Sequence, residues 1–158
     1  MDTPLTDQPW QRPRSLARLC TLSFLDQGVM SLLYFGGLLG CLSMRGLPLE
    51  AIEEQLQKGF TLFLPEADPQ MIHRSAVLMY EHGLALTAVL LARTVVRFLG
   101  TLRMWQGHRD GFHVYTTAQL LGILVPILIG GRELFTFFGL LMALNWCFLY
   151  WTQRRLMR

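Results

Sequence analysis

Long apolar runs constrain this chain more than any other feature of its sequence. Residues 19–44 contain one charged side chain, Asp26, and residues 112–130 and 134–152 contain none. A helix of about 20 apolar residues crosses the roughly 30 Å hydrocarbon layer of a bilayer, because each residue adds about 1.5 Å. We therefore expect a chain that folds in lipid, as helices that cross the membrane.

A further apolar run, residues 76–99, carries the ionisable side chains Glu81, His82, Arg93 and Arg97. Asp68 followed by Pro69 is typical of a helix start, since an aspartate caps the first turn and a proline fits its first position. The run is expected to continue as a helix to about Trp105, before Gly107 ends it. It predicts a long membrane-spanning helix with extensions beyond the lipid.

These runs predict an all-α, integral membrane four-helix bundle, formed as a single transmembrane domain by residues 1–158. The expected spans are residues 19–44, 76–99, 112–130 and 134–152. Between the first two, residues 47–64 repeat apolar side chains at helical spacing with acidic ones opposite, and Glu54 and Lys58 stand one turn apart. This pattern predicts an amphipathic helix in the connection outside the membrane.

The placement of basic residues predicts the orientation. Arginines flank the N-terminal run, the turn at residues 100–111 and the C-terminal run, whereas the connection after the first span is acidic. Basic residues near span ends favour the cytoplasmic side. We expect a multi-pass protein of the inner cell membrane with both termini and the 100–111 turn in the cytoplasm. Its basic anchor comprises Arg97, Arg103, Arg109, Arg154, Arg155 and Arg158.

The second half also carries a short motif: Met104-Trp105, Gly111-Phe112, Tyr115, Gln119 and Pro126. In these residues the chain resembles a group of small four-helix bacterial membrane proteins of unassigned function. Arg109 and Asp110 stand where lysines are expected in that group. The resemblance implies the four-helix topology and does not assign an activity.

Ionisable residues inside a membrane are costly and rare, so each is a functional hypothesis. When the expected spans are aligned by depth, one polar level appears in all four helices: Asp26, Gln27, Arg93, Gln119 and Asn145. We predict an ion pair between Asp26 and Arg93, with Gln119 and Asn145 hydrogen-bonding around it. Such a layer either fixes the register of the helices, forms a proton or ion pathway, or consists of side chains that reach the interface without partners.

Two further groups of residues follow from the helical spacing. Small or kinking residues are expected where helices pack closely: Gly36, Gly37, Gly40, Ala85, Ala88, Ala92, Gly122 and Pro126. An ionic cluster is expected at the outer face: His73, Glu81, His82, Arg132 and Glu133. Within it, we expect Glu81 to pair with Arg132, and we do not predict a metal site, because the histidines and Glu81 lack a shared helical face.

The sequence contains no catalytic motif, phosphate-binding glycine loop or cysteine pair, so no cofactor and no nucleic-acid partner is expected. The leading hypothesis is a non-enzymatic accessory, scaffolding or assembly subunit of a membrane protein complex. Its expected partners are the lipid bilayer, a membrane protein or further copies of the chain, and anionic lipid at the cytoplasmic face. The alternatives are a small oligomeric transporter or channel that uses Asp26, Arg93, Glu81 or His82, and a membrane enzyme.

Overall fold

The structure is a computed structural model that describes residues 13–63, 68–131 and 136–157. Within these ranges it contains helices and no strand, which confirms the all-helical prediction. The elements are α1 (Arg14–Ser43), α2 (Leu49–Phe63), α3 (Pro69–Trp105), α4 (Asp110–Gly130), α5 (Phe137–Gln153) and the short 3₁₀ turn η2 (Arg154–Leu156).

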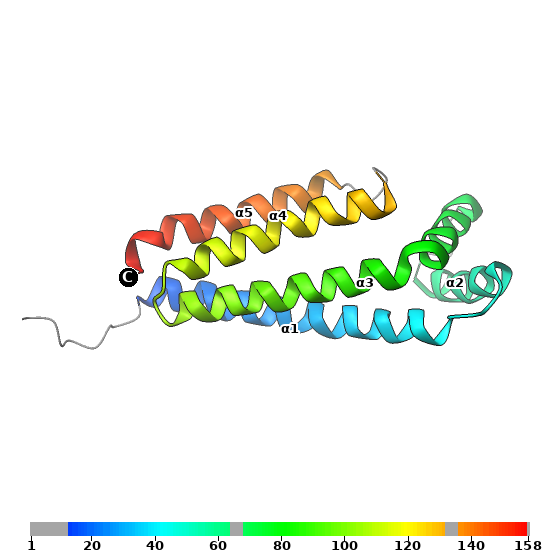
Figure 1. The fold of residues 1–158 in the computed structure, drawn as a ribbon, viewed down its shortest axis with the longest axis horizontal. Helices are drawn as coiled ribbons and strands as arrows, with labels where there is room; N and C mark the ends of the chain where they lie inside the picture. Colours follow the sequence, from blue (N-terminus) through cyan, green and yellow to red (C-terminus); the bar gives the residue numbers. More distant parts are fainter. Residues whose placement is uncertain (1–12, 64–67, 132–135, 158) are drawn as a thin grey trace, which may run out of the picture.

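The long helices form two layers, with α1 beside α3 and α4 beside α5 (Figure 1). α3 is the central element, because it contacts α1, α2 and α4. The start of α1, the α3–α4 turn and the C-terminus lie at one end of the molecule, which we call the terminal end. α2 lies at the opposite end, which we call the α2 end.

Three of these helices, α1, α3 and α4, are long and apolar enough to cross a membrane. α5 has 17 residues, and Leu134 and Phe135, which begin the predicted fourth span, lie outside the described residues. The surface of the bundle is apolar, with Leu32 75%, Leu128 83% and Phe137 73% exposed. A compact protein in water does not present apolar side chains so continuously, so the structure is that of a membrane protein.

α3 begins and ends where local signals in the sequence predict it. The Asp68 carboxylate accepts a hydrogen bond from the Gln70 backbone N–H at 2.9 Å, and Pro69 is the first helical residue, as predicted. α3 ends at Trp105, and Gly107 takes a positive φ of 92°, which an L side chain rarely adopts. α2 is amphipathic as expected, and it buries Ile52 to 3% exposure.

The closest helix contact joins α3 and α4 near the terminal end. A Cβ on Gly111 would lie 2.6 Å from the Gly100 carbonyl oxygen and 2.7 Å from the Met104 backbone nitrogen. A Cβ on Gly100 would lie 2.8 Å from the backbone nitrogen of Tyr115. Only glycine therefore allows these two backbones to approach. Neither glycine is among the predicted packing residues, although Gly111 belongs to the motif of the second half.

The predicted packing stripes are corrected in part. Ala85, Ala88 and Ala92 are exposed, and no atom outside the local helix backbone lies within 4 Å of a Cβ on Gly36 or Gly40. The reason is that α3 turns Arg93, Thr94 and Arg97, rather than these three alanines, toward its neighbours. Gly37 does pack, since its Cβ would lie 3.4 Å from Thr87, and Gly122 and Pro126 are buried.

The buried core lies toward the terminal end. Its cluster draws side chains from α1, α3, α4 and α5 and from the residue after η2: Leu16, Cys20, Met104, Phe112, Tyr115, Tyr150 and Met157. The rings of Tyr115 and Tyr150 lie 4.8 Å apart, which joins α4 to α5. Directly beyond this core, toward the α2 end, lie the polar residues of the candidate site.

Candidate functional site

The candidate site is a layer of polar side chains between α1, α3 and α4. α3 contributes Arg93, Arg97 and Thr101, which stand one turn apart and therefore share a face of the helix. α1 contributes Ser23, Asp26 and Gln27, and α4 contributes Tyr115 and Gln119. We call these residues the polar layer.

An ion pair between Arg97 and Asp26 forms the centre of the layer. The Arg97 Nη2 atom donates to the Asp26 Oδ2 atom at 3.0 Å and to the Tyr115 hydroxyl at 3.2 Å. The guanidinium also lies over the Tyr115 ring, 5.3 Å from its centroid. Arg97 is 6% exposed, so its charge is compensated inside the bundle rather than by solvent.

This geometry corrects two expectations. The partner of Asp26 is Arg97, not Arg93, and Arg97 belongs to the interior rather than to the basic anchor. The sequence placed Arg97 at the membrane edge because the apolar run stops soon after it. The helix does continue to Trp105, as predicted, but this part packs against α4 at Gly100 instead of leaving the bundle, and Arg97 is therefore inside.

Arg93 lies one turn farther from the terminal end and has a different partner. Its Nη2 atom donates to the Gln119 Oε1 atom at 2.9 Å, so Gln119 does hydrogen-bond within the layer as predicted. Its side chain lies directly on Gly122, where a Cβ would be 2.0 Å from the Arg93 Cδ and Nε atoms. The Nε atom is buried and has no hydrogen-bond partner.

A second contact in the layer uses hydroxyl groups. The Gln27 amide nitrogen lies 2.9 Å from both the Ser23 and the Thr101 hydroxyl oxygens, and Thr101 itself donates to the Arg97 carbonyl oxygen at 3.0 Å. This joins α1 to α3. The sequence predicted Gln27 but not Ser23 and Thr101 as members of the layer. Ser23 lies one turn before Gln27, and Thr101 lies one turn after Arg97. This helical spacing is the signal that could have identified them.

Asn145 does not belong to the layer. It is exposed on α5, whose buried residues are Ala143 and Tyr150. Those positions share one face, and Asn145 lies on another because it is two residues beyond Ala143. The residues selected by depth therefore come together from three helices but not from α5, since depth alone does not define the inward face.

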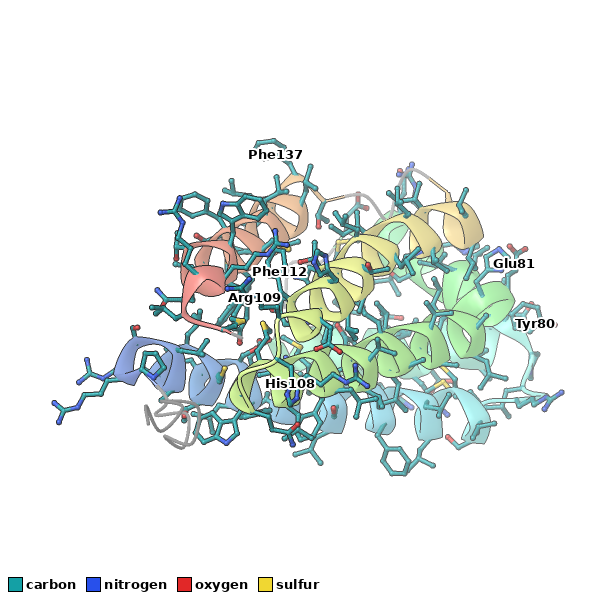
Figure 2. The ribbon with its side chains drawn as sticks, turned by 60° about the vertical axis from the view of Figure 1, so that its left-hand side comes forward. Tyr80, Glu81, His108, Arg109, Phe112 and Phe137 are labelled. Carbon is teal, nitrogen blue, oxygen red and sulfur yellow. The ribbon has the colours of Figure 1, made fainter. Side chains whose placement is uncertain are left out.

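Of the predicted outer cluster, His73, Glu81 and His82 lie among the described residues, and His73 has a different partner from the other two. Figure 2 shows Tyr80 and Glu81 projecting at the α2 end, away from Arg109 and Phe112 at the terminal end. Glu81 and His82 are 3.8 Å apart, whereas His73 contacts Glu53 of α2. Arg132 and Glu133 lie outside the described residues. In the part of the chain that is described, no group of three or more His, Cys, Asp or Glu residues is arranged to hold a metal ion.

The basic residues of the terminal end have different partners. The Arg154 guanidinium lies 5.5 Å from the Trp151 ring centroid and 5.8 Å from that of Phe112. Arg109 donates from Nε to the Met157 carbonyl oxygen at 2.7 Å, which fixes the C-terminal residues against the α3–α4 turn. Of the other predicted anchor residues, Arg103 pairs with Asp110, Arg155 is exposed, and Arg158 lies outside the described residues.

No protein-family model, curated protein sequence or solved structure matches this chain. The chemistry of the site therefore rests on its own geometry. The polar layer consists of one carboxylate, two guanidiniums, two amides and three hydroxyls, bonded mostly to each other. Such an arrangement can hold helices in register and can present a charge to the membrane interior.

Proposed function

We propose that this chain is a non-enzymatic integral membrane protein that serves as an accessory, scaffolding or assembly subunit for a partner protein in the membrane. The observation that carries the proposal is the contrast between its closed polar interior and its open apolar flanks. A channel or an enzyme needs accessible polar groups, whereas a helical subunit needs surfaces that other helices can contact.

The interior is closed because most of its polar groups bond one another; among the described residues of the layer, the buried exceptions are the Nε atoms of Arg93 and Arg97 and the Gln27 Oε1 atom. Asp26, the one acidic side chain of the layer, is bonded to Arg97. Toward the α2 end, the ten residues from Gly83 to Ala92 include no ionisable side chain, and the Thr87 hydroxyl donates to the Gly83 carbonyl oxygen of its own helix. This stretch does not favour a polar pathway between Arg93 and Glu81, which the transporter alternative requires.

In this proposal α5 is the fourth crossing, and both termini lie in the cytoplasm. Support comes from the directions of the helices. Successive long helices run in opposite directions, and α5 runs beside α4 back to the terminal end (Figure 1). Support also comes from Arg103, Arg109, Arg154 and Arg155, which gather at that end, while the acidic α2 lies at the other. The arginines beside Trp151 also suit the anionic lipid headgroups of the cytoplasmic leaflet.

The proposal is tested by extracting the tagged full-length chain in several mild detergents and measuring its native mass. A second protein, or further copies of the chain, is expected to remain bound in a fixed ratio. Monomer alone under all conditions would contradict the proposal.

The transporter alternative requires a separate measurement. The purified chain in liposomes is expected to give proton and cation fluxes equal to those of empty liposomes. A flux that Asp26→Asn or Glu81→Gln abolishes would replace the subunit function with transport.

A further inference from the structure

An open groove runs between α3 and α4 on the surface of the bundle. It encloses about 620 Å³, and residues of these two helices alone line it. Ala92, Ala118 and Gly122 are small members of its lining, and its other residues are mostly valine and leucine. Small residues between apolar walls are what a further transmembrane helix needs for close packing.

Arg93 contributes to the lining of this groove and carries a charge that the described residues leave without a counterion. Its one hydrogen-bond partner is the neutral amide of Gln119, and its Nε atom is buried without a partner. The ionisable groups near it include Arg97, Tyr34, Tyr115, Asp26 and Cys147. Of these only Asp26 is an acid, and its carboxylate is bonded to Arg97.

The depth of Arg93 restricts what supplies the missing negative charge. Ten residues of helix separate it from Arg103, which forms an exposed ion pair with Asp110 at the terminal end. Ten residues correspond to about 15 Å, or roughly half of the hydrocarbon layer. Lipid phosphates lie beyond that distance, so the counterion has to come from a group inside the membrane.

A second copy of this chain does not offer such a group among its described residues. Asp26 is engaged by Arg97, and Asp110 lies at the α3–α4 turn. The remaining described acids, Glu50, Glu53, Glu54, Asp68 and Glu81, belong to α2 or to the α2 end of the chain. The described residues of a second copy therefore supply no complementary group, which favours a different protein as its source.

We propose that the α3–α4 groove receives a transmembrane helix of a partner protein, whose aspartate or glutamate side chain pairs with Arg93. This inference rests on the proposed subunit function and specifies its contact surface. Gly122 positions the arginine, because the absence of a Cβ lets the guanidinium side chain lie across α4 at the edge of the groove.

Photo-crosslinking in intact membranes tests the inference. The reactive residue p-benzoylphenylalanine replaces Leu121, which is 52% exposed in the groove, or Leu32, which is 75% exposed on α1 and serves as the control. We expect a protein adduct from position 121 and none from position 32. No adduct at 121, or an adduct with lipid only, overturns the inference.

The charge is tested in the same assay, with adduct yields normalised to the amount of chain in the membrane. Arg93→Gln is expected to lower the yield at least tenfold, and Gly122→Ala to lower it by displacing the arginine while keeping the charge. Arg154→Gln, which removes a charge at the terminal end, is the matched control and should leave the yield unchanged. An unchanged yield in Arg93→Gln overturns the inference.

Once the adduct identifies the partner, a charge exchange completes the test. Arg93→Glu should abolish the adduct, and an arginine in place of the partner's intramembrane carboxylate should restore it. A partner without such a carboxylate overturns the inference. If a partner copurifies but crosslinks from position 32 instead, the groove proposal fails while the subunit function stands; if no partner is found by either method, both fail.

Discussion

At the scale of single residues, the two arginines of α3 have different electrostatic surroundings although they stand one turn apart. Asp26 compensates the charge of Arg97, which also bonds the Tyr115 hydroxyl, whereas Arg93 bonds the neutral amide of Gln119. Removing one member of a buried ion pair leaves the other charge uncompensated, which costs more than the pair itself contributes. The Asp26 side chain is 31% exposed, so the cost is smaller than for a fully buried pair.

Asp26→Asn and Arg97→Gln should each lower the free energy of unfolding by about 2 kcal/mol. The double variant should lose about as much as either single variant, because the second change removes the uncompensated charge. Unfolding in mixed micelles with increasing SDS measures these energies. As the control, Asp26→Asn combined with Arg93→Gln should be additive within about 0.5 kcal/mol; coupling to Arg93 instead of Arg97 would reject the observed pairing.

Sequence reasoning found the level of the polar layer but not its pairing. Asp26, Gln27, Arg93 and Gln119 were selected by depth, and the structure brings all four into the layer. Spacing alone could not choose between Arg93 and Arg97, because residues four apart share one helical face. The choice depends on how α3 is rotated against α1 and α4, and long-range packing sets that rotation.

At the scale of helices, the α3–α4 hairpin depends on two glycines that face each other. Gly111→Ala should lower the free energy of unfolding by about 2 kcal/mol or more, because the added methyl group would meet backbone atoms that cannot move aside. Gly36→Ala on α1 is the matched control and should stay within about 0.5 kcal/mol, since its Cβ would enter open space. The same SDS titration compares them, and equal stability of the two variants would contradict the assigned helix contact.

The α2 helix packs mainly against α3, at the α2 end of the bundle. His73 of α3 contacts Glu53 of α2 at a half-exposed position, and Ile52 is the buried apolar residue of the described part of α2. Glu53→Gln should therefore increase the hydrogen exchange of α2 amides severalfold and leave α3 and α4 unchanged, because exposed ion pairs contribute less than about 1 kcal/mol. Exchange that rises throughout the bundle would show that α2 supports the whole fold.

The length of α2 and the limits of α3 were predictable because local signals define them. An aspartate–proline pair starts α3, and a glycine with positive φ follows its end. The outward direction of Ala85, Ala88 and Ala92 was not predictable from spacing, because alanine fits both a helix contact and a lipid-facing surface. The structure assigns them to the surface, and Ala92 lies in the groove with Arg93.

At the scale of the whole molecule, the number of crossings decides on which side the C-terminus lies. α5 covers about 26 Å as a helix, which is short for a hydrocarbon layer of roughly 30 Å. Arg154 and Arg155 follow it directly and favour the cytoplasmic side. If α5 crosses, both termini share that side; if only α1, α3 and α4 cross, the two termini lie on opposite sides.

A fluorescent-protein fusion after Arg158 distinguishes these topologies, because green fluorescent protein becomes fluorescent in the cytoplasm and not after export through the general secretion pathway. We expect a bright fusion at the C-terminus and a dark one when the chain is truncated after Gly131, at the α2 end of α4. Alkaline phosphatase, which is active only outside, should give the opposite result at both positions and should be active when inserted at Gln57 of α2. A dark C-terminal fusion with active phosphatase there would reduce the bundle to three crossings and place the arginines beside Trp151 outside the cell. That result would also remove the electrostatic basis for the proposed contact with cytoplasmic lipid headgroups.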